Sequence, residues 1–482
     1  MLMIAAFIFP VLAGIVISVL KIETGKRHLL YAGAMLLTDL ISIWAAVWGG
    51  SITAVTFFKN VTLTFTMDNL GRYVLIGVLL LYSAVLFYSF EYMKMEENEE
   101  RFFAFFFISF GALISVCMAG NLVTLYFCFE MLTLTSMPLV IHEMTRDAVN
   151  AALKYLFYSI GGALMGLLAV FFVYYFSSGD GSFVMGGFLD TAKTAGHEKL
   201  LLAVIMVGII GFGTKAGLYP MHGWLPTAHP IAPAPASSLL SGIIVKAGIV
   251  CLIRLVYFSV GADFIRGTWV QYVWITLCLF TIFMGSMMAF LEKVTKKRLA
   301  YSTISQLSYI ILGLSLLSED GVRGGLLHLL SHTTSKGCLF LCAGVFIYKL
   351  GIRNVADLKG IGKKMPITLG CFTIAALSLV GIPPMGGFLS KWVIASAAIS
   401  TGIPVYRFLA PVVLLISALL TAGYLLPIVV DGFFPGRSEE VQEAEVQSAE
   451  PSKLMTIPMI ILCCGAAVMG IWGNVIVSFF AF

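Results

Sequence analysis

Seven ionisable side chains lie inside strongly apolar stretches of this sequence. They are two acids, Asp39 and Glu130, and five bases, Lys215, Lys246, Arg254, Lys336 and Lys391. A charge at bilayer depth costs about 3 kcal/mol or more, and it persists only where it is paired, hydrated or functional. We therefore expect these groups to carry the chemistry of the chain.

Two histidines extend this set. His328, His332 and Lys336 follow one another at intervals of four, so on a helix they share one face. Histidine exchanges protons near neutral pH. A desolvated lysine can also release its proton, and a nearby carboxylate opposes that release. These residue types favour proton transfer along a row that contains Glu130, Lys215, Lys246, His328, His332, Lys336 and Lys391.

The opposition between Glu130 and Lys215 suggests how such a row could be driven. While the two side chains are paired, the proton stays on the lysine, and when the pair opens the proton is pushed towards Lys246. A moving ion pair can thus drive a proton sideways through a helix bundle. The alternative is a set of static ion bridges that only hold helices together.

The remaining polar residues are weaker candidates. Asp39 is more simply explained as a local helix partner, and Arg254 as a side chain that reaches the outer membrane surface. His222, His229 and Asp39 are kept as accessory candidates because each lies close to the row in sequence or inside an apolar run.

Proline interrupts two of the apolar stretches. Pro220 and Pro226 fall in residues 215–226, and Pro383 and Pro384 fall in residues 381–391. Both segments contain the pattern Pro-Met-x-Gly-aromatic-Leu and a buried lysine. An interrupted helix frees backbone carbonyls at membrane depth, which water or an ion must satisfy. Each break is therefore a candidate hydrated half-channel, and the alternative is a dry packing kink.

The elements that position these residues must be membrane helices. Of the 482 residues, 59% are hydrophobic and only 11% are charged, under half of the ~25% usual in soluble domains. A span needs about 20 apolar residues. We predict an all-α polytopic protein of about fourteen helices, and strands are not expected because membrane barrels alternate polar and apolar residues. The spans are 2–20, 28–50, 73–90, 102–119, 121–141, 155–177, 200–219, 236–257, 269–291, 300–317, 324–348, 366–399, 408–430 and 454–480.

The basic residues indicate the orientation. Of 30 Lys and Arg, 18 fall in the connections of one side and seven in those of the other. Since basic residues gather on the cytoplasmic side, both termini are predicted outside a cell membrane, either an inner or a plasma membrane. The acidic stretch 438–453 then faces the cytoplasm as a surface connection, and the alternative is a docking segment for a partner.

The two breaks also predict an internal repeat. They fall in helices 7 and 12, and helices five apart cross the membrane in opposite directions. Inverted repeats with interrupted helices are typical of ion transporters. We expect one integral membrane domain, 1–482, with helices 1–3 in 1–100, a first repeat of helices 4–8 in 101–257, a second of helices 9–13 in 269–430, and a last helix in 454–482.

No cofactor or metal site is expected in this chain. Its nine cysteines lie in apolar runs without a C-x-x-C pair, which does not favour a zinc or iron–sulfur site. Catalytic redox residues are likewise not predicted. The net charge of +5 gives no reason to expect nucleic acid, because the basic residues sort by membrane side.

At this point the residues resemble a known family. Residues 213–248, with Pro-Met-His-Gly-Trp-Leu-Pro at 220–226 and Ala-His-Pro-x-Ala-Pro at 228–233, are similar to the antiporter-like subunits of respiratory complex I, membrane-bound hydrogenases and multi-subunit sodium/proton antiporters. Glu130, the 328–336 relay and Gly-Gly-Phe-Leu-Ser-Lys at 386–391 support the resemblance. The 228–233 run looks most like the hydrogenase branch.

The resemblance implies roles for the row. Glu130 and Lys215 would be the switching pair, Lys246, His328, His332 and Lys336 a central hydrophilic axis, and Lys391 the group that exchanges with the opposite side. The chain would translocate protons, with a link to sodium left open, as a subunit of a redox-driven complex. Its partners would be other membrane subunits, peripheral iron–sulfur, hydrogenase or dehydrogenase subunits, and the lipid bilayer.

Two other functions stay open. A sodium/proton antiporter assembly driven by ion gradients alone would use the same row, and only the identity of the partners separates it from a redox-driven pump. The third hypothesis is a membrane scaffold whose ionic row is static. It predicts that removing the charge of Lys246 or Lys336 impairs assembly before it alters ion movement.

Overall fold

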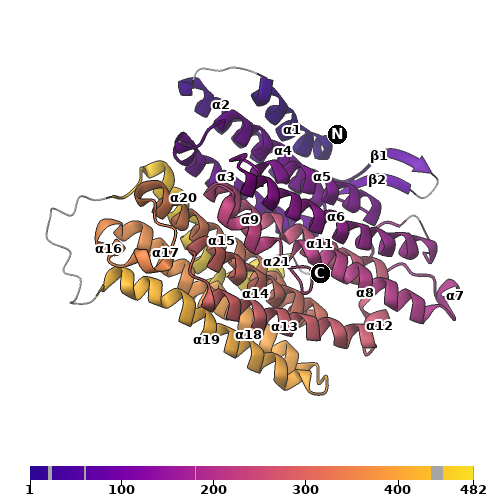
Figure 1. Cartoon of the computed structure of the whole chain (residues 1–482). Helices are drawn as coiled ribbons and strands as arrows, with labels where there is room; N and C mark the ends of the chain where they lie inside the picture. Colours follow the sequence, from indigo (N-terminus) through magenta and orange to yellow (C-terminus); the bar gives the residue numbers. More distant parts are fainter. Residues whose placement is uncertain (20–23, 59–60, 178, 180, 436–448, 481–482) are drawn as a thin grey trace.

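The structure is a computed structural model that describes residues 1–19, 24–58, 61–177, 179, 181–435 and 449–480. Its first part comprises α1 (Leu2–Val19), α2 (Thr24–Trp48), β1 (Ser51–Phe58), β2 (Val61–Thr66), α3 (Asn69–Tyr92) and the short 3-10 helix η1 (Met93–Met95). Figure 1 shows α1, α2 and the two strands at one end of the molecule. Most of the predicted acidic connection, residues 438–448, lies outside the described residues.

The middle part carries the first interrupted helix. Its elements are α4 (Glu99–Cys117), α5 (Leu122–Val140), α6 (Arg146–Tyr175), α7 (Thr191–Thr194), α8 (Glu198–Lys215), α9 (Leu225–Ile231), α10 (Ala234–Leu239), α11 (Lys246–Ile253) and α12 (Ala262–Ile265). Two π-helical turns, η2 (Leu240–Ile244) and η3 (Arg254–Val260), flank α11, so α10 to η3 form one continuous helical stretch.

The last part carries the second interrupted helix. Its elements are α13 (Trp269–Leu291), α14 (Thr295–Ser315), α15 (Glu319–Leu350), the 3-10 helix η4 (Val355–Leu358), α16 (Ile361–Lys364), α17 (Pro366–Val380), α18 (Gly386–Ser400), α19 (Tyr406–Phe433), α20 (Lys453–Ile471) and α21 (Gly473–Phe479). In Figure 1, α19 lies at the opposite end of the molecule from α1 and α2, and α15 lies between them.

The prediction of an all-α polytopic membrane protein is confirmed. Within the described ranges, eleven helical segments are long and apolar enough to cross a membrane. They are α1 to α6, the α10–η3 stretch, α13, α15, α19 and α20. The other three predicted spans coincide with α8, α14 and the pair α17 and α18. The total of fourteen spans, the inverted repeat and the orientation stay predictions.

The expectation of no strands is wrong at one place. Residues 51–58 and 61–66, in a predicted outer connection, form an antiparallel pair of strands, β1 and β2. Both segments are rich in Thr, Val and Phe, residues that favour strands. They are too short to span a membrane, so a prediction based on long apolar runs does not identify them. The Thr64 amide donates to Thr124 Oγ1 at 2.8 Å, so the hairpin is tied to the start of α5.

Helix starts follow local capping rules. The side chain of Asn121 accepts from the Thr124 amide at the start of α5, and that of Ser318 accepts from the Gly321 amide at the start of α15. A side-chain oxygen at this position satisfies one of the amides that the first helical turn leaves free. The start of α17 is held differently: Glu450 accepts from the amides of Ile367 and Thr368.

The core is built around α15. This helix contacts α3, α10, α14, α17, α18 and α20, and 94% of its most apolar window is buried, against 28% for α1 and α2. A helix with neighbours on all sides can hold polar groups away from lipid. His328, His332 and Lys336 are thus placed on a long helix that other helices enclose almost completely.

Candidate functional site

Lys215 is the last residue of α8 and is buried against α5 and α6. Its Nζ donates to Thr133 Oγ1 at 2.9 Å and to Tyr155 Oη at 2.5 Å. The same ammonium lies 4.7 Å from the centre of the Tyr155 ring and 5.6 Å from that of Phe129. Hydroxyls and aromatic faces therefore take the place of water around this lysine.

Glu130 lies on α5, three residues before Thr133, but it does not pair with Lys215. Among the described residues Lys215 hydrogen-bonds with Thr133 and Tyr155, and Glu130 Oε1 is buried without a hydrogen-bond partner. The charges nevertheless act on each other. Glu130 and Lys215 are therefore close enough for their charges to interact but are not hydrogen-bonded to each other, and their role as a switching pair stays a prediction.

Glycines let the helices around Lys215 approach closely. A Cβ on Gly162 of α6 would lie 2.6 Å from Gly211 O of α8, and one on Gly211 would lie 2.5 Å from Gly162 O. A Cβ on Gly248 of α11 would lie 2.6 Å from Phe212 O and 3.0 Å from Lys215 Cβ. Since Lys246 is two residues from Gly248, this contact brings the helix of Lys246 against that of Lys215.

The second half of the row follows α15. Lys246 Nζ hydrogen-bonds with His332 Nδ1 at 2.8 Å and donates to Ser241 O at 2.7 Å. The rings of His332 and His328 lie 6.0 Å apart. His328 Nδ1 then bonds with Ser390 Oγ at 2.8 Å. Side chains from α11, α15 and α18 are thus linked in one buried series.

Lys391 and Lys336 lie at the two ends of this series. Tyr309 of α14 stacks on His328 at 5.4 Å, and its ring centre is 5.1 Å from Lys391 Nζ. Lys336, which is fully buried, donates to Leu299 O at 3.0 Å. The Nε2 atoms of His328 and His332 have no hydrogen-bond partner in the described structure, so each can donate or accept a further hydrogen bond according to the tautomer of its ring.

Both predicted helix breaks are present. α8 ends at Lys215 and α9 begins at Leu225, and the chain between them contains Pro220 with a cis bond to Tyr219. α17 ends at Val380 and α18 begins at Gly386, with a cis bond between Pro383 and Pro384. Pro226 is not in the gap but in the first turn of α9, where the missing amide costs nothing.

Side chains satisfy carbonyls that the breaks leave free. Lys391 Nζ donates to Leu379 O at 2.5 Å and to Val380 O at 3.1 Å, at the end of α17. Trp224 Nε1 donates to Thr214 O at 3.0 Å, at the end of α8. Cationic groups are favoured at helix carboxyl ends, so the break holds Lys391 in the membrane region.

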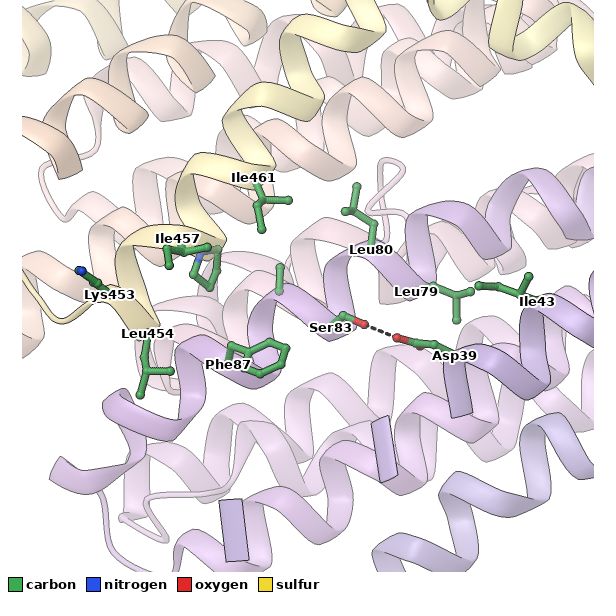
Figure 2. Close-up of a pocket in the computed structure, with 12 residues that line it drawn as sticks. Asp39, Ile43, Leu79, Leu80, Ser83, Phe87, Lys453, Leu454, Ile457 and Ile461 are labelled. Carbon is green, nitrogen blue, oxygen red and sulfur yellow. Dashed lines mark hydrogen bonds between the residues drawn. The ribbon is translucent and has the colours of Figure 1, made fainter. Parts of the chain in front are cut away.

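Two of the predicted accessory residues, His222 and Asp39, are not brought to the row. His222 lies half-buried in the first break and stacks on Tyr219. Asp39 accepts from Ser83 Oγ at 2.7 Å, so its partner is on α3 rather than local. Figure 2 shows this bond in a pocket of mostly apolar side chains from α2, α3 and α20, with Lys453 at the other end.

The expectation for Arg254 is corrected. Its guanidinium does not reach solvent: the residue is 1% exposed, both terminal nitrogens donate to the Asp68 carboxylate, and the rings of Phe183 and Phe258 lie within 4.7 Å. Asp68 also caps α3. This pair joins η3 to α3, so its position indicates a structural role.

The sequence reasoning missed several neighbours of the row. Thr133, Tyr155, Tyr309 and Ser390 are uncharged, and only a helical projection onto the faces of Glu130, Lys215 or Lys391 could have suggested them. Lys296 lies in the connection between the predicted spans 269–291 and 300–317, yet it is only 4% exposed. It stands in the run Lys-Lys-Arg at 296–298, where no pattern distinguishes a buried lysine.

A comparison with protein families decides the relationship. The family model described as "NADH:quinone oxidoreductase/Mrp antiporter, TM" matches residues 119–426. The chain belongs to this family. The matched range contains every residue of the row, from Glu130 to Lys391, and the predicted resemblance is confirmed.

Individual relatives agree with this assignment. The chain is 31% identical to NADH-quinone oxidoreductase subunit N of Desulforudis audaxviator, over 91% of this chain and 85% of that protein. It is 32% identical to hydrogenase-4 component B of Escherichia coli over 70% of this chain, but it spans only 51% of that protein. The fold is similar to a chain of the Mrp complex from Dietzia sp., with a TM-score of 0.83, 19% identity, and 100% and 96% of the two chains covered.

Proposed function

We propose that this chain is an ion-translocating membrane subunit of a larger respiratory complex, in which protons move along the buried row. The observation that carries the proposal is a buried row of two hydrogen-bonded pairs, Lys246–His332 and His328–Ser390, whose histidine rings lie 6.0 Å apart. Side chains that each hold or release one proton are what a proton path requires. The relationship to subunits of complex I and hydrogenase assemblies supports the same function.

The open Glu130–Lys215 arrangement fits a switch. In this state Lys215 is held by neutral hydroxyls, which bind the amine whether or not it is protonated. Closing the pair with Glu130 would favour the ammonium, and opening it would favour transfer towards Lys246. Electron transfer would occur in peripheral iron–sulfur, hydrogenase or dehydrogenase subunits, and other membrane subunits would flank this chain.

Lys215→Ala tests the proposal. The complex is assayed in inverted membrane vesicles for ion movement coupled to electron flow, together with the amount of assembled complex. We expect coupled ion movement to be lost while assembly persists. Lys199→Ala, an exposed lysine of the same helix α8, is the matched control. Unchanged coupled pumping in Lys215→Ala would show that the row does not translocate ions.

A second candidate is a subunit of a sodium/proton antiporter assembly driven by ion gradients. The family description names Mrp antiporters beside the quinone oxidoreductases, and the same row would serve both. Gentle extraction of the native complex followed by mass spectrometry separates the two. Iron–sulfur or hydrogenase subunits favour the redox-driven pump, whereas a set of hydrophobic antiporter subunits alone favours the exchanger.

A further inference from the structure

Lys296, in the first turn of α14, is buried against the carboxyl end of α9. Its Nζ donates to Pro230 O at 3.4 Å and to Ala232 O. Pro230 belongs to the last turn of α9, and Ala232 follows directly after that helix. The neighbouring Lys297 instead pairs with Glu292 at 2.7 Å and is 40% exposed. Two adjacent lysines therefore differ in environment, and only Lys296 faces the interior.

Two carboxylates that are less buried than Lys296 act on its charge. Glu143, in the connection from α5 to α6, is exposed, and Glu96, just after η1, is half-buried. Their charges act on Lys296, as does that of Arg353. Burial and the charge of Glu143 raise the pKa of the Glu96 carboxyl, although Lys296 and Arg353 oppose the shift. Such a carboxyl binds protons more readily than one in free solution.

His229 lies on the inner side of Lys296. It is fully buried, and neither Nδ1 nor Nε2 has a hydrogen-bond partner in the described structure. Its ring stacks on Phe340 at 4.8 Å, and Phe340 is one helical turn from Lys336 on α15. The charges of Lys296, Lys336 and Lys246 act on His229. An unpartnered imidazole is thus placed between the buried lysine and the row.

We propose that Glu143, Glu96, Lys296 and His229 form the proton inlet of the row, leading from the predicted cytoplasmic face to Lys336. A proton from water binds a carboxylate and passes to the neutral amine of Lys296. The ammonium passes it to one ring nitrogen of His229, and the other ring nitrogen releases a proton to the neutral amine of Lys336. The burial of the four side chains increases in this order.

The inference rests on the proposed function, because an inlet has no role without ion movement along the row. A purely structural explanation would make Lys296 a clamp on the carbonyls of Pro230 and Ala232 and His229 a filler against Phe340. That explanation does not account for an imidazole with two unpartnered nitrogens, which is costly in a buried site.

The test uses the assembled complex in inverted vesicles, where the predicted cytoplasmic face contacts the medium. Lys296→Met and His229→Phe remove the proton-carrying groups, and the phenyl ring of the latter preserves the stack on Phe340. Lys297→Met is the matched control. We expect coupled proton movement to fall roughly tenfold or more in the first two variants and to stay unchanged in the control, at equal amounts of assembled complex.

A pH profile gives an independent readout. In the double variant Glu96→Gln and Glu143→Gln, we expect slower proton movement that recovers as the medium is acidified, because Lys296 then receives protons directly from water. A structural role of the carboxylates predicts no such recovery.

The outcomes distinguish the two proposals. Wild-type proton movement in His229→Phe and Lys296→Met, with Lys215→Ala inactive, would overturn the inlet and leave the proposed function standing. Wild-type movement in Lys215→Ala as well would overturn both. If the Lys296→Met complex fails to assemble, proton movement in the His229→Phe variant alone tests the inlet.

Discussion

A buried lysine without a salt bridge is the central feature at the scale of single residues. Lys215 is 1% exposed, and its amine is surrounded by Thr133, Tyr155 and Phe129 rather than by a carboxylate. Aromatic faces and hydroxyls stabilise a cation by less than a close carboxylate does in a dry site. The lysine is therefore sensitive to any movement of Glu130.

Removing the hydroxyl of Tyr155 tests this view. Tyr155→Phe loses the acceptor at 2.5 Å from Lys215 Nζ and the bond to Ser136 Oγ, but it keeps the ring beside Trp224. We expect assembly to persist and ion movement in vesicles to slow by about fivefold, the equivalent of roughly 1 kcal/mol for one hydrogen bond. Tyr158→Phe, on the same helix, is the control. Equal rates for both variants would contradict the prediction.

His142 makes a separate prediction about pH, because it lies outside the membrane spans. It is 3% exposed, and burial together with the charge of Arg101 lowers its pKa from 6.5 to about 4. The folded chain therefore binds fewer protons here than the unfolded chain between these values, so stability present above pH 6.5 is lost as the pH falls towards 4. The loss is at most about 3 kcal/mol.

His142→Phe should remove this contribution, and its ring can keep the edge contact with Phe102. We expect the decrease in Tm between pH 6.5 and 4, measured in detergent, to be smaller in the variant than in the wild type. Parallel Tm curves would show that His142 is not the group responsible.

At the scale of elements, close contact between helices sets the site. α6 supplies Tyr155 and α8 supplies Lys215, and the two helices cross where Gly162 meets Gly211. In a bilayer such small residues let backbones approach and so fix the distance between side chains further along. The same contact that stabilises the pair of helices therefore sets the Tyr155–Lys215 distance.

Adjacent glycines on α6 allow a matched test. A Cβ at Gly162 would lie 2.6 Å from Gly211 O, whereas one at Gly161 would meet nothing within 4 Å. We expect Gly162→Ala to lower stability by about 1–3 kcal/mol and to slow ion movement. Gly161→Ala should be neutral or slightly stabilising, because alanine favours helix. Thermal unfolding in detergent measures both, and similar Tm values would refute the proposed contact.

The helices and their contacts also show which features of the fold could be predicted from the sequence alone. Apolar runs located the long helices, and Pro220 and Pro383 located both breaks, because hydrophobicity and the missing proline amide act locally. The partners of His332 and His328 come from helices far away in the chain, Lys246 of α11 and Ser390 of α18. Such pairs depend on tertiary packing, as does the burial of Lys296, and no spacing rule could reveal them.

At the scale of the whole molecule, the buried polar groups lie within a largely apolar core, and the outer helices expose apolar side chains. α1 and α2 are largely exposed and apolar, as expected of helices that face lipid or a neighbouring membrane subunit. The connections that hold Glu96 and Glu143 belong to the side predicted to be cytoplasmic. The connection that holds Asp263 belongs to the other side, so the direction of the inlet depends on the orientation.

Cysteine labelling tests the orientation. Eight of the nine native cysteines are buried and Cys464 is exposed. The Cys464→Ala variant should therefore show little reaction with thiol reagents before a new cysteine is introduced. We expect Asp263→Cys to react with a membrane-impermeant thiol reagent in intact cells, and Glu97→Cys to react only in inverted vesicles, since both sites are exposed. The opposite pattern would reverse the predicted orientation of both termini.

The burial of α15 has a consequence for how the chain is made. The buried part of this helix carries two histidines, Lys336 and several hydroxyls. Its neighbours include α3, α10 and α14, which precede it in the chain, and α17, α18 and α20, which follow. Lipid alone offers such a helix little stabilisation. During synthesis α15 must pack against helices that are already inserted in the membrane. Part of its surface lacks its native neighbours until α20 has left the ribosome. Biogenesis, and not only ion movement, therefore depends on the polar face of this one helix.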